Sequence, residues 1–396
     1  MDYSIQISKL FYERFINEED ISLFSPHEVP GLYDAFGTDK FDALYKKYEK
    51  DKTVPKKTIA AQELFADLLK ERAETGRIYI MNMDHSNSHS SFKDKVSMSN
   101  LCQEITLPTT PIKGIDDAEG EIALCILSAI NVGAIGNLNE LESLCDLSVR
   151  ALDEIIELQD YPVKAAEVST KSRRSLGIGY IGLAHYLAKN GVKYSDPKAW
   201  ELVDRLSEAF QYYLLRASCD IAQEKGKCEA FERTKYADGL LPIDHYKKEV
   251  DEIVPHKQRM AWETLRKDIG KHGLRHSTLS AQMPSESSSV VSNETNGIEP
   301  PRALLSIKKS KKGPLKQIVP GFPNLKNAYT LLWDMGSNEG YIKIVSVMQK
   351  YFDQAISGNW SYNPLQFENN EVPLSVMAQD MLMAYKYGWK TSYYQN

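Results

Sequence analysis

Cysteines, long apolar runs and surplus positive charge are all scarce in this sequence of 396 residues. The cysteines number five and none belongs to a CxxC pair, which argues against a disulfide framework and a cysteine-based zinc site. With 48 Lys and Arg against 54 Asp and Glu the formal net charge is −6, so neither a nucleic-acid partner nor an anionic lipid surface is expected. The sequence has no run of about 18 uncharged apolar residues, and its start lacks the basic-then-apolar layout of a signal peptide. We therefore expect a cytoplasmic protein without a membrane partner.

What is present is the composition of a globular protein, 42% hydrophobic and 26% charged. Segments with helical periodicity alternate with short β-rich runs, which predicts an α/β fold. No boundary divides the chain, so residues 1–396 are treated as one domain. The predicted helices are 5–23, 60–75, 139–159, 200–225 and 339–357, and the predicted strands are 77–83, 122–127, 277–283, 302–308 and 389–394, with a basic turn at 310–314.

A glycine motif, Gly177-Ile-Gly-Tyr-Ile-Gly182, matches the GxGxxG turn of dinucleotide-binding folds. It follows the polar stretch 169–175 rather than an apolar strand, and no acidic residue ends a strand about 20 positions later. Close helix packing is therefore favoured over a nicotinamide site.

Two histidines, His85 and His89, have the four-residue spacing that would let them share a metal on a helix. The surrounding Ser and Asn residues favour a loop, however, and no third ligand is evident. No metal site is predicted.

The segment around Asn100 carries three chemically useful side chains. Alternate residues of an extended chain project to the same side, so Asn100, Cys102 and Glu104 would share one face. A thiol, a carboxylate and a carboxamide could act as nucleophile or hydrogen abstractor, base and orienting group. A half-buried strand with its polar residues turned to solvent explains the same spacing.

A second thiol, Cys125, lies in the apolar run 121–128, which predicts a buried strand. Taken alone, it is a packed core cysteine. Cys145, Cys219 and Cys228 lie on or near predicted helices, and a structural role is the simplest interpretation for them.

A candidate anion site follows the predicted strand 277–283. Residues Pro284, Ser285, Glu286, Ser287 and Ser288 suit the start of a helix, where free backbone N–H groups and hydroxyls would bind a phosphate. An ordinary capped helix start fits the same residues equally well.

Several of these motifs occur together, and in the same order, in one enzyme family. They are Ser99-Asn-Leu-Cys-Gln-Glu104, Gly120-Glu-Ile-Ala-Leu-Cys125, Met283-Pro-Ser-Glu-Ser-Ser288, Ser292-Asn-Glu-Thr-Asn-Gly-Ile-Glu-Pro-Pro-Arg302 and Tyr393-Tyr394. Together they resemble the large, catalytic subunit of aerobic class Ia ribonucleotide reductase. The resemblance covers essentially the whole chain, but it corresponds only to the C-terminal part of that subunit.

The resemblance implies the C-terminal part of a ten-stranded α/β barrel, with a finger loop at about 97–107 through its centre. Cys102 would become a thiyl radical that abstracts the 3′ hydrogen of a ribonucleoside diphosphate. Glu104 would be the base on the 3′ hydroxyl, Asn100 would orient this pair, and Cys125 would be one of two cysteines that reduce the 2′ carbon.

The resemblance also implies two further parts of the site. Tyr393 and Tyr394 would relay the radical to Cys102, and residues 284–288 would hold the substrate diphosphate. On this interpretation the chain itself binds no metal and no cofactor.

The implied partners supply what the chain does not contain. A separate N-terminal large-subunit chain would carry the first half-barrel, the second redox cysteine, the ATP-cone and the loops that bind nucleotide effectors. A small subunit would carry a diiron-tyrosyl radical, and thioredoxin or glutaredoxin would re-reduce the disulfide. The chain is then one part of a split subunit, inactive without its partners. The alternative is a noncatalytic half-barrel scaffold that only binds reductase subunits, although a scaffold has no need of the six retained side chains.

Overall fold

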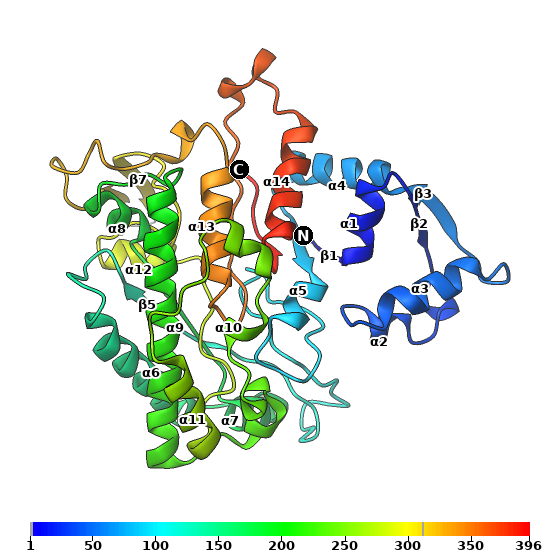
Figure 1. The fold of residues 1–396 in the computed structure, drawn as a ribbon, viewed down its shortest axis with the longest axis horizontal. Helices are drawn as coiled ribbons and strands as arrows, with labels where there is room; N and C mark the ends of the chain where they lie inside the picture. Colours follow the sequence, from blue (N-terminus) through cyan, green and yellow to red (C-terminus); the bar gives the residue numbers. More distant parts are fainter. Residues whose placement is uncertain (1–2, 311–312) are drawn as a thin grey trace.

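The computed structural model describes residues 3–310 and 313–396 as a mixed α/β protein (Figure 1). Its α-helices are α1 Lys9–Ile16, α2 Leu32–Ala35, α3 Phe41–Lys50, α4 Ala61–Thr75, α5 Met83–Ser88, α6 Glu140–Leu158, α7 Lys164–Arg173, α8 Leu183–Lys189, α9 Pro197–Lys225, α10 Pro242–His245, α11 Trp262–His272, α12 Glu286–Val291, α13 Glu339–Gln349 and α14 Leu374–Lys386. Its strands are β1 Tyr3–Ile7, β2 Asp20–Leu23, β3 Lys57–Ala60, β4 Ile78–Asn82, β5 Ile126–Asn131, β6 Leu176–Ile181, β7 Leu305–Ser310, β8 Gly313–Ile318 and β9 Thr391–Ser392. Within this part of the chain, no helix is long and apolar enough to cross a bilayer.

The described strands pair in four separate small sheets. Strand β4 lies between β1, which is parallel to it, and β9, which is antiparallel. Strands β5 and β6 are parallel, whereas β2 with β3 and β7 with β8 form antiparallel pairs. The α/β class is confirmed, but a closed barrel is not formed by these strands.

The site is built along an irregular continuation of the β5–β6 sheet. Beside β6, residues 278–282 run parallel with a single bridge from Ile178 to Ser280, and a further bridge joins Gln282 to Ile356. From there the backbone N–H of Ala355 donates to the carbonyl of Glu104 at 3.0 Å. A series of neighbouring extended segments therefore leads from β5 to the loop that carries Cys102.

The body of the molecule packs around the long helix α9, which contacts α6, α11 and α13 (Figure 1). A smaller lobe of α1, α2, α3, β2 and β3, drawn in blue, projects from this body and joins it through α4. At the other end of the chain, α14 packs against α4 and α13, and β9 returns to pair with β4. The first and last segments of the chain therefore lie together.

One glycine shows how closely the C-terminal segment approaches the end of α4. Gly76 ends α4 with a left-handed φ of 69°. This backbone conformation has a higher free energy for residues with a side chain than for glycine. A Cβ there would also lie 2.8 Å from the backbone oxygen of Gln395.

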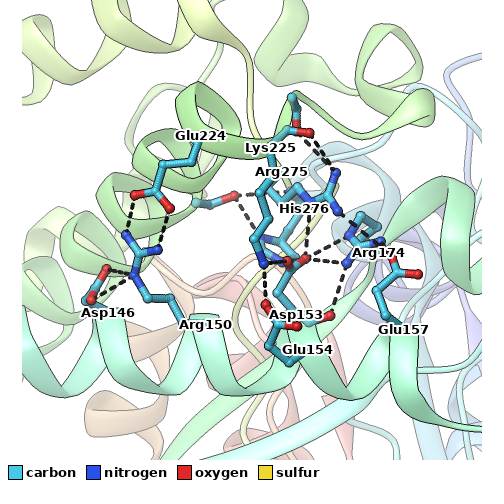
Figure 2. Close-up of polar contacts among 12 residues, drawn as sticks. Asp146, Arg150, Asp153, Glu154, Glu157, Arg174, Glu224, Lys225, Arg275 and His276 are labelled. Atoms are coloured by element: carbon cyan, nitrogen blue, oxygen red, sulfur yellow. Dashed lines mark hydrogen bonds and ion pairs between the residues drawn. The ribbon is translucent and has the colours of Figure 1, made fainter.

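A cluster of buried charges joins α6 to three other segments (Figure 2). Asp153 of α6 is fully buried and accepts from Arg174 Nε at 2.8 Å and from Arg275 Nε at 3.2 Å. His276 Nε2 lies 3.2 Å from the same carboxylate, and Lys225 at the end of α9 lies 3.3 Å from its other oxygen. The cluster fixes the residues that lead into β6 and into the 278–282 segment.

Several predicted elements are confirmed. Helices 60–75, 139–159 and 200–225 correspond to α4, α6 and α9, and strand 77–83 to β4. The strand predicted at 302–308 appears as β7, shifted toward the C-terminus, while the turn predicted at 310–314 includes residues 311 and 312, which lie outside the described residues.

Other predicted elements are wrong or partly wrong. The helix predicted at 5–23 is instead β1, α1 and β2, because its first and last residues pair with other strands. The strand at 122–127 begins only at Ile126, and 277–283 makes isolated bridges rather than a strand. Helix α13 ends at Gln349 rather than at 357, and the closing strand is reduced to Thr391–Ser392.

Candidate active site

The loop 97–107 folds back on itself around Asn100. The Asn100 Nδ2 donates to Glu104 Oε2 at 2.9 Å, and its Oδ1 accepts from the backbone N–H of Ile105 at 3.0 Å. Gln103 adopts a φ of 72°, which turns the chain sharply between the two partners. The extended, alternating segment predicted from spacing is therefore wrong, although Asn100 and Glu104 do meet.

Glu104 is a buried carboxylate, 2% exposed. Besides the bond from Asn100, its Oε2 accepts from Ser357 Oγ at 3.2 Å. Burial raises the pKa of Glu104, and the hydrogen bonds from Asn100 and Ser357 oppose that rise. A carboxyl tuned in this way can accept a proton at moderate pH.

Cys102 lies at the outer end of the loop and contacts Tyr393. The hydroxyl of Tyr393 donates to Cys102 Sγ at 3.4 Å, across 291 positions of sequence. Burial raises the pKa of both groups, so both hold their protons at neutral pH. A protonated thiol and a phenol in contact suit the transfer of a hydrogen atom rather than of a charge.

The two terminal tyrosines form an aromatic cluster. The ring centroids of Tyr393 and Tyr394 lie 4.2 Å apart. The buried ring of Tyr79, on β4, lies 4.9 Å from Tyr393 and 5.3 Å from Tyr394. Both tyrosines follow β9, and Tyr393 N–H donates to the carbonyl of Gly358 at 2.9 Å, so Tyr393 is held by a backbone hydrogen bond as well as by ring packing.

Cys125 immediately precedes β5 and is linked to the loop through Gln354. The Gln354 Nε2 donates to Cys125 Sγ at 3.6 Å, and its Oε1 accepts from Thr106 N–H at 3.3 Å. Burial raises the pKa of Cys125 to about 12. The structure thus brings Cys125 near the loop, with no hydrogen bond recorded between the two thiols.

The candidate phosphate segment forms the start of the short helix α12. Ser285 is buried and its Oγ donates to Met283 O at 3.1 Å, and it accepts no hydrogen bond from the N–H groups at the start of the helix. Glu286, Ser287 and Ser288 are exposed. The segment is therefore open to a ligand, with two hydroxyls on its surface.

A cleft of about 780 Å³ connects α12 to the terminal tyrosines. Pro284 and Glu286 line one part of the cleft, and Tyr393 and Tyr394 line another. Cys102 and Glu104 lie behind the tyrosines and do not line it. The cleft is large enough for a nucleotide-sized molecule.

The other motifs serve structure. His85 and His89 lie on and just after α5 rather than on a loop, and one nitrogen of each ring contacts a backbone carbonyl. No group of three His, Cys, Asp or Glu side chains within 3–310 and 313–396 could hold a metal. Residues 177–181 of the glycine motif lie in the buried strand β6, and Gly182 immediately precedes α8.

Two residues of the site are missed by the sequence reasoning. Ser357 donates to Glu104 and, at 2.5 Å, to the carbonyl of Cys102, and Gln354 touches Cys125. Both lie in the segment 352–357, inside a stretch that is predicted as helix from its apolar periodicity. A serine and a glutamine in such a stretch carry no signal of chemistry.

Comparisons with known proteins place the chain in one enzyme family. The family model described as "Ribonucleotide reductase, barrel domain" matches residues 1–395. Ribonucleoside-diphosphate reductase subunit alpha of Haemophilus influenzae is 57% identical over 401 residues, and the corresponding Escherichia coli protein, subunit alpha of reductase 1, is 54% identical. The subunit alpha of phage T4 is 42% identical over 406 residues.

These matches cover 100% of the chain but 53% of each of those relatives. The chain thus spans about half the length of the curated relatives it matches. Because the family model matches residues 1–395, the chain belongs to the ribonucleotide reductase barrel-domain family.

Proposed function

We propose that the chain is a catalytic component of a ribonucleoside-diphosphate reductase, an oxidoreductase that supplies deoxyribonucleotides for DNA synthesis. The observation that carries this proposal is the 3.4 Å contact between the Tyr393 hydroxyl and Cys102 Sγ. It joins a tyrosine pair at the edge of a cleft to a thiol whose loop also holds a buried carboxylate. A scaffold that only binds reductase subunits would gain nothing from this alignment.

In the proposed reaction, a hydrogen atom leaves Cys102 toward Tyr393, and the thiyl radical abstracts the 3′ hydrogen of the ribose. Glu104, held by Asn100 and Ser357, takes the proton of the 3′ hydroxyl as the 2′ hydroxyl leaves as water. Two electrons and two protons reach the sugar from Cys125 and a second thiol, which end as a disulfide. The substrate thus exchanges one C–O bond for one C–H bond, and Cys102 regains its hydrogen atom at the end.

Residues 284–288 give the diphosphate of the substrate a place in this proposal. The diphosphate would lie against residues 284–288, where Ser287 and Ser288 are exposed and a helix begins, since the first N–H groups of a helix have no acceptor within the helix itself. Glu286 would contact sugar or backbone, because a carboxylate repels a diphosphate.

The remaining parts are proposed to come from partners. A complementary N-terminal large-subunit chain would complete the ten-stranded barrel around a finger loop at 97–107 and bring the second redox cysteine, the ATP-cone and the effector sites. A small subunit with a diiron-tyrosyl radical would oxidise the tyrosine pair, and thioredoxin or glutaredoxin would reduce the disulfide. The separate strand pairs of this chain leave edges to which a further half-barrel could add.

The decisive experiment measures reduction of a ribonucleoside diphosphate by this chain mixed with the small subunit, a dithiol reductant and an effector, with and without the complementary chain. We expect activity only in the complete mixture, and loss of at least about 10³-fold in Cys102→Ser, because the thiol acts only by giving up its hydrogen atom. The control is Cys145→Ser, which changes a buried cysteine on α6 outside the site. Assembly of the mixture should be unchanged in both variants. Activity that survives Cys102→Ser would favour a different chemistry, and no activity in a stable complex would favour the scaffold.

A further inference from the structure

The buried carboxamide of Gln354 contacts both Cys125 and the loop that carries Cys102. The side chain is 1% exposed, and its Oε1 accepts from the N–H of Thr106, two residues after Glu104. Its Nε2 donates to Leu176 O at 2.9 Å and to Cys125 Sγ at 3.6 Å. Both amide hydrogens and the amide oxygen are therefore used, each on a different segment of the chain.

The space for the Cys125 sulfur is left by a glycine. A Cβ on Gly177 would lie 2.7 Å from Cys125 Sγ and 2.6 Å from Leu127 Cδ2, closer than such atoms approach. Gly177 has no left-handed φ, so backbone conformation does not require glycine there. The Cys125 sulfur occupies the volume that a side chain at position 177 would fill. This explains why the first residue of the GxGxxG run is a glycine.

The backbone from which Gln354 projects is itself fixed. The buried Lys390 donates its Nζ protons to the carbonyls of Phe352, Asp353 and Gln354 at 3.2, 2.6 and 2.9 Å. The N–H of Gln354 donates to the carbonyl of Ser280 at 3.0 Å. The carboxamide therefore has little freedom to follow the thiol if the thiol moves.

We propose that Gln354 and Gly177 form a thiol seat, in which Gly177 leaves room for the Cys125 sulfur and Gln354 fixes that sulfur relative to the loop of Cys102 and Glu104. Both are positioning residues. The proposal deepens the proposed function and rests on it for the redox role of Cys125. Because one carboxamide binds both Cys125 and Thr106, the spacing between the reducing thiol and the loop is set by a single side chain.

The first test compares alkylation of Cys125 and Cys102 by iodoacetamide at pH 9, followed by peptide mass spectrometry on the whole chain. In Gln354→Met, of similar shape, Cys125 loses the donor that favours its thiolate, and its alkylation should slow by about 3–10-fold, the worth of one hydrogen bond. A side chain that only supports packing would give the opposite result, since loosening exposes both thiols and speeds alkylation. The matched control is Gln211→Met, a buried glutamine on α9 that donates to Asp353 and touches neither thiol nor loop.

A second variant separates the two contacts of Gln354. Gln354→Glu keeps an acceptor for Thr106 but loses the amide donors, so alkylation of Cys125 should slow while that of Cys102 stays at the unmodified rate. Equal changes at the two thiols would overturn the assignment of Gln354 to Cys125.

The third variant tests the space. Gly177→Ala should lower kcat in the complete mixture at least about tenfold with KM unchanged, because the sulfur is displaced while the substrate cleft is untouched. Gly270→Ala on α11 adds the same methyl where nothing lies within 4 Å and should have no effect.

These readouts keep the two proposals apart. If alkylation of Cys125 is slower in Gln354→Met but no ribonucleoside diphosphate is reduced under any condition, the thiol seat is supported and the proposed reductase function is rejected. If reduction of the ribonucleoside diphosphate depends on Cys102 but is unchanged in Gln354→Met and Gly177→Ala, the reductase function is supported and the thiol seat is rejected.

Discussion

Glu104 shows how a single buried carboxyl is held between two opposing effects. Burial raises its pKa, and hydrogen bonds from Asn100 and Ser357 lower it again. Ser357 also donates to the carbonyl of Cys102, so one hydroxyl contacts both the Glu104 carboxyl and the loop that bears Cys102. The pKa of Glu104 therefore depends on a residue that lies far from it in sequence.

The first prediction concerns Ser357→Ala. Removing the Ser357 hydrogen bond should raise the pKa of Glu104 further, because the carboxylate loses a donor and remains buried. A base works when ionised, so activity falls as the pH drops through its pKa, and the acidic limb of kcat/KM should move to higher pH in the variant. The shift is expected to be about one pH unit, the worth of one hydrogen bond to a charged group.

The measurement is the pH profile of ribonucleoside diphosphate reduction by the complete mixture. Ser143→Ala on α6, whose hydroxyl donates to a local carbonyl, is the control and should leave the profile unchanged. A profile of unaltered position but lower height in Ser357→Ala would mean that Ser357 supports the loop and does not tune Glu104.

For single residues, the sequence predicts which side chains are reactive better than it predicts which side chains they contact. Asn100, Cys102 and Glu104 stand out because their side chains are reactive and close in sequence. Asn100 and Glu104 do meet, although through a turn, whereas Cys102 contacts Tyr393. Gln354 and Ser357 reach the same site across 229 and 253 positions. Such long-range contacts depend on how distant segments pack, and no local pattern records them.

Among the elements, those with a long, regular apolar face are predicted best. Helices α4, α6 and α9 satisfy their own backbone hydrogen bonds, so periodicity is enough to find them. Strand β1 and the 278–282 segment depend on partners elsewhere in the chain, and a mixed apolar pattern such as that of residues 5–23 fits helix or strand equally well. Pairing in the folded molecule decides between them.

The second prediction concerns the docking of α13, the helix that leads into segment 352–357. Gly340 lies in its first turn, and a Cβ there would lie 2.6 Å from Tyr194 O and 2.9 Å from Ser195 Cα. Backbone cannot move aside as a flexible side chain can, so Gly340→Ala should lower the free energy of unfolding by about 2 kcal/mol. Urea unfolding followed by far-UV circular dichroism measures this loss.

A nearby glycine provides the control. Gly336 lies just before α13 with nothing within 4 Å of its would-be Cβ and no left-handed φ, so Gly336→Ala should change the stability little. Equal stabilities for the two variants would show that α13 can shift away from Tyr194.

At the scale of the whole molecule, buried charges tie distant segments together. The Asp153 cluster joins α6, the end of α7, the end of α9 and residues 275–276 (Figure 2). Burial alone would raise the pKa of Asp153, but His276 and Arg174 bond to it and lower that pKa. The ionised carboxylate is thus the stable form, and protonation would leave buried cations without a counter-charge.

A second cluster, around Glu121, makes similar ties close to Cys125. Arg173 of α7 donates to its Oε1 and Oε2 at 3.1 and 2.8 Å, and Arg233 donates to its Oε1 at 3.0 Å. Thr110 Oγ1 donates at 3.0 Å from the chain that follows the Cys102 loop. One carboxylate therefore links four separate segments.

The last prediction follows from the pKa of Glu121 and concerns unfolding in acid. Burial alone would raise the pKa, but hydrogen bonds and positive charge from Arg173, together with Arg233, lower it from 4.5 to about 2. A depressed pKa in the folded state gives stability that is complete above pH 4.5 and is lost as the pH falls toward 2. Glu121→Gln should cost about 2 kcal/mol at pH 7, because the buried Arg173 then keeps Asp94 alone of its two acidic partners, and the cost should shrink as the pH falls below 4.5.

Urea unfolding at a series of pH values between 7 and 3 measures the difference between the two proteins. Glu119→Gln provides a matched control, because Glu119 pairs with Lys113 where both side chains are more than 80% exposed, and such a pair adds little stability. A cost in Glu121→Gln that stayed constant down to pH 3 would mean that the residue acts through its shape and hydrogen bonds. A cost that disappears with acid would show that the charge itself holds the Cys125 segment against α7.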